Sequence, residues 1–356
     1  MIKAYELNIP KDIQIDEILN NFNHIVIYPT INTLKNTDCK ENKVFTKRIA
    51  MGEAKLKILF FKVEIAQEYC DNPQYSVRFD GYRGYIVLND EYCNENEKIE
   101  YIQDFGIAYS KKDPNKRAIG VFLDDLAKLS EKDQLKWYIK LEKEQNDFVI
   151  NRGFYENLVI GNWINNVPIY DALLDEMKII NKMCQKMHVP KLYKEEFDIN
   201  DDRIKDYRII FLPTLKNYWD FLLVIEKMFV NNINTDTFTK GDGTTKNITE
   251  LREENGDKKG SIKLFSEWLN LNVNGKNSIE DDIIKPLKNI RKIRQKPAHA
   301  LQEDKYDEEI WKKQNELILE IYKTIRNIRL LFSNHPNCKD IEIPDYLVTG
   351  KDITIF

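Results

Sequence analysis

Four amphipathic segments dominate the second half of the chain. Apolar residues recur at helical spacing over residues 215–229, 262–272, 283–295 and 307–331. A helix of this kind buries one apolar stripe, so successive helices pack their stripes together around a shared core. The pattern therefore predicts an all-α bundle over residues 205–335.

The beginning of the chain has a different pattern. A largely apolar run at residues 56–65 predicts a buried central strand, and aromatic runs on either side of an Asp-Gly turn predict a hairpin over residues 75–88. We also expect two strands and one helix near the start, at residues 2–9, 24–28 and 13–22. Residues 1–135 are therefore predicted to form a mixed α/β domain, which places the whole chain in the α+β class.

Two further stretches connect and follow these parts. Residues 136–204 contain amphipathic segments and are interpreted as a helical connector. A polar, acidic stretch at residues 193–208 is the best candidate for a boundary before the bundle. Residues 336–356 alternate in polarity and are interrupted by Pro344, so we expect an extended tail that adds an edge strand to the N-terminal domain.

Charge, hydropathy and cysteine usage limit the class of protein. The formal net charge is −4, and residues 201–356 contain as many basic as acidic side chains, so any nucleic-acid site is expected to be local. No apolar run reaches the ~18 residues needed to span a bilayer, and the start lacks a secretory pattern. Five unclustered cysteines are typical of free thiols in a reducing compartment. We therefore expect a cytoplasmic protein without membrane contact. The high content of Lys, Asn and Ile is typical of proteins from AT-rich bacterial genomes.

One arginine departs from the charge pattern of the third predicted helix. The isoleucines and the leucine of this helix form a buried stripe, whereas its lysines gather on the opposite face. Arg294 lies about 40° from Ile290, inside the apolar stripe. Its guanidinium is therefore expected to be desolvated and to need an anion. The candidate partners are Asp220, Glu226 and Glu267.

His299 follows Arg294 with four residues between them, and the pair has two interpretations. In the first, Arg294 makes a structural ion pair and His299 faces solvent. In the second, the two form a phosphate site, in which the arginine binds a phosphodiester and the histidine exchanges a proton. Six cations lie at residues 285–296 with no acid over residues 283–302, which indicates an unexplained positive field around this pair.

Arg329 and His335 have a similar spacing but a different context. Arg329 lies in the last turn of the last long predicted helix, where a basic side chain interacts favourably with the helix dipole. We therefore prefer the pair at Arg294 and His299 as the candidate site.

A short motif links the third and fourth predicted helices. It reads Arg294-Gln295-Lys296-Pro297-Ala298-His299. This motif resembles that of the HEPN superfamily of helical-bundle ribonucleases, in which an Arg, a polar residue directly after it and a nearby His lie between the last two long helices. The likeness covers residues 205–335. Active members of this superfamily cut RNA without a metal as homodimers and often act as toxins or antiviral effectors, whereas inactive relatives bind nucleotides or partners.

The resemblance implies a role for each residue around the motif. Arg294 would neutralise the charge that develops on phosphorus, and His299 would shuttle a proton while the ribose 2′-hydroxyl attacks. The RNA backbone would be contacted by Arg291, Lys292, Gln295 and Lys296. No metal or cofactor is expected. The expected partners are RNA, a second copy of the chain, and a regulatory protein or nucleotide sensed by the N-terminal domain.

Two other functions remain open. A catalytically inactive HEPN-like module would use Arg294 to bind a nucleotide, RNA or a protein partner without turnover. A purely structural or scaffolding protein would use Arg294 for stability alone.

Two patterns suggest metal ligands without supporting a site. Asp124 and Asp125 are adjacent on a predicted strand, where neighbouring side chains point to opposite faces. A zinc site would need ligands from two distant segments, namely Cys184, His188, His335 and Cys338. Pro336 is typical of a helix stop, so the second half of such a site is not expected to form.

Overall fold

The computed structural model describes most of the chain from residue 41 onward. The described residues are 41–79, 82–92, 101–113, 116–162, 166–199, 201–243, 245–273, 276–295 and 303–355. The strands and the helix that we expect before residue 40 lie outside these ranges. Lys296 and His299 also lie outside them.

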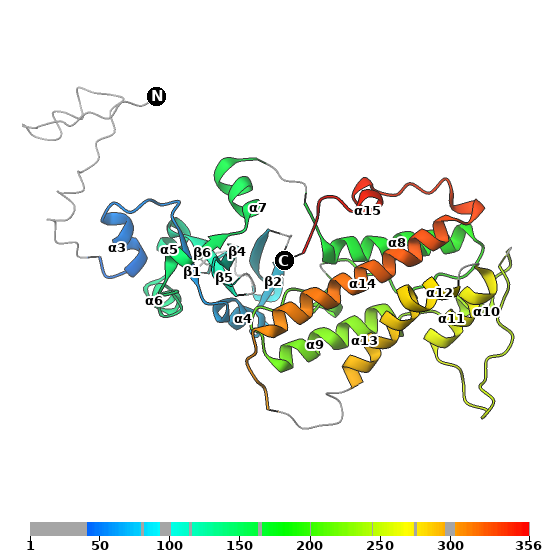
Figure 1. Cartoon of the computed structure of the whole chain (residues 1–356). Helices are drawn as coiled ribbons and strands as arrows, with labels where there is room; N and C mark the ends of the chain where they lie inside the picture. Colours follow the sequence, from blue (N-terminus) through cyan, green and yellow to red (C-terminus); the bar gives the residue numbers. More distant parts are fainter. Residues whose placement is uncertain are drawn as a thin grey trace, which may run out of the picture.

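A six-stranded antiparallel sheet forms the first part of the described structure (Figure 1). Its strands are β1 (Ile58–Phe61), β2 (Tyr75–Phe79), β3 (Arg83–Leu88), β4 (Asp104–Ser110), β5 (Arg117–Phe122) and β6 (Phe148–Ile150). The order is β1-β5-β4-β3-β2, with β6 beside β4. β2 and β3 form the predicted hairpin, with Tyr75 opposite Leu88. This sheet, followed by helices, confirms the α+β class.

The apolar strand β1 lies at an edge of this sheet. Among the described strands it pairs with β5 alone, so the prediction of a central strand is wrong. Its apolar side chains are buried by helices instead: the ring of Phe61 contacts those of Phe45 and Trp137, at centroid distances of 6.0 and 5.0 Å. On the other face, the ring of Phe60 contacts that of Phe148 at a centroid distance of 5.9 Å. An apolar run therefore indicates that both faces of a strand are covered, and it does not require a strand on each side.

Short helices accompany the sheet. They are α3 (Val44–Ala50), α4 (Glu64–Cys70), α5 (Leu123–Lys128), α6 (Glu131–Ile139) and α7 (Arg152–Tyr155), with the π-helix η3 (Glu156–Ile160) and the 3-10 turns η1 (Asp90–Tyr92) and η2 (Gln145–Asp147). α6 begins at an N-cap, where Ser130 Oγ accepts a hydrogen bond from Asp133 N at 3.2 Å. Asp124 and Asp125 lie in the first turn of α5 and both contact Lys128. The expectation of a strand at these two residues is wrong.

The second part of the structure is helical, as predicted. Its long helices are α8 (Ile169–Lys186), α9 (Leu215–Glu226), α11 (Ser261–Asn272), α13 (Lys285–Gln295) and α14 (Glu309–Ser333). Shorter elements are α10 (Asp236–Thr239), α12 (Lys276–Ile279), the π-helices η5 (Lys227–Asn231) and η6 (Glu280–Ile284), and the 3-10 turns η4 (Asp202–Ile204) and η8 (Pro336–Cys338). Figure 1 shows α8, α14, α9 and α13 running side by side. None of the helices described is long and apolar enough to cross a membrane.

α8 belongs to the stretch interpreted as a connector, yet it packs along α14 through a buried ion pair. Arg329 Nε lies 2.5 Å from Glu176 Oε2, and the two side chains are 2% and 0% exposed. Arg329 also donates to the carbonyl oxygen of Leu347 at 2.9 Å. Burial raises the pKa of Glu176, and the guanidinium of Arg329 opposes that rise. Arg329 therefore joins two helices and the tail, which the helix dipole alone does not explain.

The tail takes a different course from the predicted one. It contains the short helix α15 (Asp345–Thr349) and ends in β8 (Ile353–Thr354), which pairs in parallel with β7 (Val167–Pro168). The expectation that the tail adds a strand to the N-terminal sheet is therefore wrong. The strand pairs instead with the residues immediately before α8.

The sheet and the helices share one apolar core. Phe105 of β4 contacts Phe211 edge to face, with ring centroids 5.9 Å apart. Trp311 of α14 donates from Nε1 to the carbonyl oxygen of Ile210 at 2.7 Å. Residues 210 and 211 therefore connect the sheet with α14.

We expect the loss of one partner of the buried ion pair to destabilise the protein more than the loss of both. Arg329→Met leaves Glu176 buried without a cation and should lower the free energy of unfolding by about 3–5 kcal/mol. Adding Glu176→Leu should recover much of this loss, because apolar residues can replace a buried pair. Urea denaturation measures the effect.

Arg152→Met is the matched control, because Arg152 is 87% exposed and pairs with Glu156 on the surface. This change should cost at most about 1 kcal/mol. Similar losses for Arg152→Met and Arg329→Met would contradict the assigned role of the buried pair.

Candidate functional site

Arg294 lies in the last turn of α13 and faces the end of α9. Its Nε is 3.2 Å from Oε2 of Glu226, the last residue of α9. Glu226 is thus the partner among the three candidate acids, whereas Glu267 pairs with Lys259 at 2.9 Å. The side chain of Arg294 remains 35% exposed. The expectation of an anionic partner is confirmed, but the guanidinium is less desolvated than predicted.

A second arginine shares the same carboxylate. Arg291 Nε lies 3.8 Å from Glu226 Oε1, and Arg291 Nη2 donates to Asn231 Oδ1 at 3.4 Å. Residues three apart on a helix lie on the same face, which explains why Arg291 and Arg294 both face α9. Two guanidinium groups therefore meet one carboxylate, which leaves a surplus of one positive charge. We call Arg291, Arg294, Glu226 and Asn231 the arginine cluster.

The π-helix η5 forms one wall of the arginine cluster. It follows α9 directly and ends at Asn231. A π-helical hydrogen bond joins residues five apart, so Glu226 and Asn231 lie about one turn from each other and face the same neighbour. Glu226 is only 8% exposed, and a carboxylate this buried needs a cation. The structure therefore explains why α13 presents arginines at this point.

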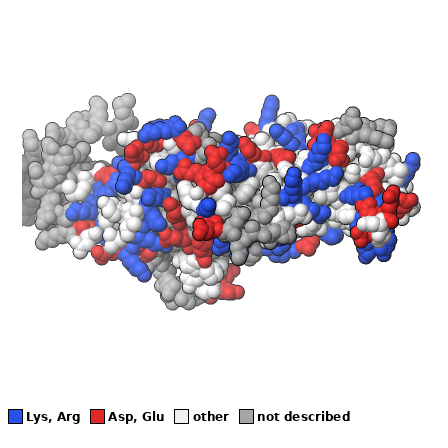
Figure 2. Space-filling view, turned by 60° about the horizontal axis from the view of Figure 1, so that its bottom comes forward, with Lys and Arg blue, Asp and Glu red and all other residues white. Residues whose placement is uncertain are grey.

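Other cations of α13 are matched by acids that lie outside the acid-free stretch. Lys285 Nζ is 2.5 Å from Asp281 Oδ1, and Lys288 Nζ is 3.0 Å from Glu280 Oε1. The positive field inferred from the sequence is therefore smaller than expected, because η6 supplies carboxylates one or two turns earlier. Lys292 is exposed and makes no ion pair within the described ranges. Figure 2 shows Lys and Arg mixed with Asp and Glu over the face it presents.

The other residues of the predicted site are only partly described. Gln295 is exposed at the end of α13. Lys296 and His299 lie outside the described residues, so the geometry between Arg294 and His299 stays a prediction. After the described residues begin again at 303, Asp304 Oδ1 accepts a hydrogen bond from Lys216 N at 2.9 Å and Lys305 O accepts one from Leu215 N at 3.1 Å. These bonds hold the chain before α14 against the first turn of α9.

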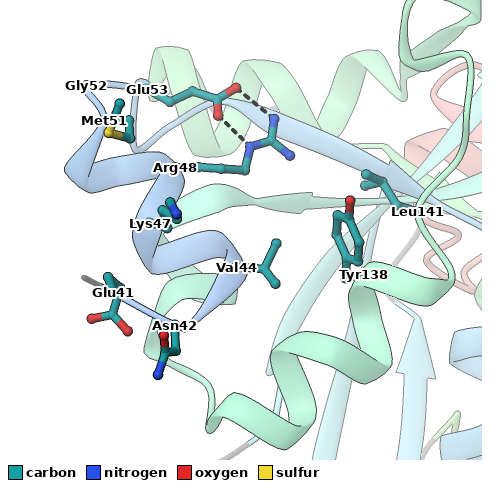
Figure 3. Close-up of a pocket in the computed structure, with 10 residues that line it drawn as sticks. All are labelled: Glu41, Asn42, Val44, Lys47, Arg48, Met51, Gly52, Glu53, Tyr138 and Leu141. Atoms are coloured by element: carbon teal, nitrogen blue, oxygen red, sulfur yellow. Dashed lines mark hydrogen bonds and ion pairs between the residues drawn. The ribbon is translucent and has the colours of Figure 1, made fainter. Parts of the chain in front are cut away.

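A hollow of about 820 Å³ lies near the start of the described chain, between α3 and α6 (Figure 3). Figure 3 shows Val44 and Tyr138 on one side and the Arg48–Glu53 pair on another. Hydrogen bonds from Arg48 and Lys57, opposed by partial burial, lower the pKa of Glu53 to about 2. The lining contains two acidic and two basic side chains. Its charges are balanced, so this hollow gives no preference for an ion.

The zinc interpretation finds no support in the described residues. Cys338 Sγ lies 3.7 Å from the carbonyl oxygen of Met183, next to Cys184, so the two distant segments do meet. Burial raises the pKa of the Cys184 thiol to about 12, which keeps it protonated at neutral pH. Within the described ranges, no three His, Cys, Asp or Glu side chains are grouped so that they could hold a metal ion.

We expect the two arginines of the cluster to compensate for each other in stability. Arg291→Ala or Arg294→Ala alone leaves Glu226 with one cation, and each should cost about 1 kcal/mol. The double variant leaves the buried carboxylate of Glu226 without a cation. Its free energy of unfolding should therefore fall by more than the sum of the two single losses, roughly 3 kcal/mol or more. Adding Glu226→Gln should restore part of the loss. Denaturant unfolding of the four variants measures these differences, and strictly additive losses would show that the carboxylate is not shared.

The cluster combines two arginines, a buried carboxylate and an amide where α9 and α13 meet. A comparison of the chain with models of protein families, with curated proteins and with solved structures finds no match. A functional proposal therefore rests on these side chains and on the motif that begins at Arg294.

Proposed function

We propose that the protein is a metal-independent endoribonuclease of the HEPN type. The observation that carries this proposal is the arginine cluster: Arg291 and Arg294 share the single buried carboxylate of Glu226. The surplus positive charge lies at the end of α13, four residues of sequence before His299. A phosphodiester carries one negative charge and would match this surplus.

The proposed reaction breaks one phosphodiester bond by internal attack. The ribose 2′-oxygen forms a bond to phosphorus and loses its proton, while the 5′-oxygen of the next nucleotide leaves and gains one. His299 would transfer these protons, since an imidazole exchanges protons near neutral pH. The products are a 2′,3′-cyclic phosphate and a 5′-hydroxyl, and this route needs no metal ion.

Arg294 would stabilise the charge that builds up on the phosphorus oxygens. Its partner Glu226 contacts Nε and would fix the direction of the guanidinium, which is still one-third exposed to a ligand. Arg291 is held in turn by Asn231 and would contact the neighbouring backbone together with Lys292, Gln295 and Lys296. Glu226 is therefore a positioning residue in this proposal.

The biological setting is also part of the proposal. By analogy with active members of the superfamily, two copies would pair through the bundle so that both Arg294–His299 pairs face one cleft. The protein would act in the cytoplasm as a toxin or an antiviral effector. The sheet domain would restrain it until a regulatory protein or nucleotide is sensed, because an unrestrained ribonuclease harms its host.

A second candidate is an inactive HEPN-like module that binds a nucleotide, RNA or a protein partner. The pairing of Arg294 with Glu226 favours it, because a charge surplus suffices to hold an anion without turnover. The two candidates differ in a single outcome, which is RNA cleavage.

We expect purified protein to cut mixed single-stranded RNA in the presence of a chelator, and His299→Ala to lower the rate by about 10²–10⁴. Gel analysis of end-labelled RNA measures the rate, and circular dichroism and size-exclusion chromatography check folding and dimerisation. His335→Ala is the control, because His335 follows Arg329, which is buried in an ion pair with Glu176 and cannot contact RNA. Equal cleavage by wild type and His299→Ala would rule out the proposed mechanism, and RNA binding without any cleavage would favour the second candidate.

A further inference from the structure

A pocket of about 460 Å³ shares Asn231 with the arginine cluster. One wall is formed by the chain around residues 194–204, and the other by the end of α9 with η5. Its volume falls within the range of small-molecule sites. The pocket therefore borders the arginine cluster at Asn231, close enough for both to take adjacent parts of one ligand.

Two lysines give this pocket a positive charge. Lys194 and Lys227 are exposed lining residues, and neither makes an ion pair with any residue that the structure describes. The acidic lining residue Glu195 is held by Arg203 at 2.5 Å, and Asp201 holds the same guanidinium at 2.6 Å. Counting both carboxylates, one positive charge remains in surplus. An anionic group between the lysines would neutralise it.

An aromatic ring lies next to these charges. The guanidinium carbon of Arg203 is 5.2 Å from the centroid of the Phe197 ring. Two carboxylates fix Arg203, so its guanidinium keeps a constant position over one face of the Phe197 ring. Val224 and Met228 add apolar lining. Aromatic rings and guanidinium planes are the groups on which nucleobases stack.

The two walls are fastened to each other. Asn232 donates from Nδ2 to the carbonyl oxygen of Glu195 at 2.8 Å and accepts from Glu195 N at 2.9 Å. Lys194 N donates to the carbonyl oxygen of Asn232 at 3.0 Å. These hydrogen bonds, two from the Asn232 side chain and one between backbone groups, set the spacing of the pocket before any ligand arrives, which lowers the entropy cost of binding.

We propose that this pocket binds one nucleoside phosphate unit, with the base against Phe197 and the phosphate between Lys194 and Lys227. The unit is either a free mononucleotide or one residue of an RNA strand. In an RNA strand, the neighbouring phosphate would lie on Arg291 and Arg294, and this second step rests on the proposed ribonuclease function. The pocket itself needs no cleavage activity.

The test is calorimetric titration of the full chain with the four nucleoside 5′-monophosphates, inorganic phosphate and a short single-stranded DNA that cannot be cut by 2′-attack. Lys194→Ala/Lys227→Ala should weaken binding of the best monophosphate by at least about tenfold. Lys312→Ala/Lys323→Ala is the matched control, since it removes two exposed lysines of α14 that do not line the pocket. This control should leave the affinity unchanged.

The variant Phe197→Leu distinguishes the contribution of the base to binding from that of the phosphate. It keeps an apolar side chain, so the fold should persist, but it removes the ring and should weaken monophosphate binding roughly fivefold or more while sparing inorganic phosphate. Competition between the monophosphate and the DNA shows that a residue of a nucleic-acid strand occupies the pocket, and binding of the monophosphate alone identifies a free nucleotide.

The proposal is overturned if no monophosphate binds, or if the control variant weakens binding as much as Lys194→Ala/Lys227→Ala. Monophosphate binding by a protein that cuts no RNA would keep the pocket and refute the ribonuclease. Cleavage of RNA without monophosphate binding would support the ribonuclease and refute the pocket.

Discussion

The arrangement of the helices depends on how buried carboxylates are neutralised. Glu176 and Glu226 both lie inside the helical part, and each needs a cation because an unpaired buried charge costs several kcal/mol. Glu176 receives one arginine, Arg329, and the pair is almost entirely shielded from solvent. Glu226 receives two arginines, and both are about one-third exposed. The first pair is shielded from solvent, whereas the second leaves one positive charge in surplus near the surface.

This difference follows from where each carboxylate lies along its helix. Glu176 is near the middle of α8, surrounded by α14 and the tail, so its cation is buried with it. Glu226 is the last residue of α9, where the π-helix η5 begins, and the two arginines that it contacts remain about one-third exposed. The arginine cluster therefore opens toward solvent and toward the pocket at Asn231. Helix ends and π-helical turns are frequent positions for functional groups.

Much of the fold was predictable from periodicity. The helices at residues 215–229, 262–272, 283–295 and 307–331, and the hairpin over residues 75–88, follow from patterns that act within one element. Three features were not. The strand β1 is an edge strand, the tail pairs with β7, and α8 packs on α14, because each depends on contacts between distant segments.

The candidate site was predictable only in part. A helical projection predicts which way the Arg294 side chain points, but it does not predict how far that side chain lies from solvent. It therefore indicated a buried arginine, whereas the structure has a partly exposed one. Arg329, whose place at a helix end is explained from sequence by the helix dipole, is almost completely buried. Glu226 was among three possible partners, and its selection required the packing of α13 on α9. Asn231 was missed because no pattern signalled the π-helix, while the spacing of Arg291 and Arg294 would have suggested a shared anion.

The central claim is that the charge surplus of the arginine cluster binds a phosphate. It is tested most directly by the salt dependence of binding to a short single-stranded DNA that cannot be cut by 2′-attack. If Arg294 contacts a phosphate, Arg294→Ala should reduce the slope of log K against log salt by about 0.7, the value for one contact on a single strand. Lys323→Ala, an equal loss of charge at an exposed position of α14, should leave the slope unchanged. The same slope in wild type, Arg294→Ala and Lys323→Ala would contradict the account.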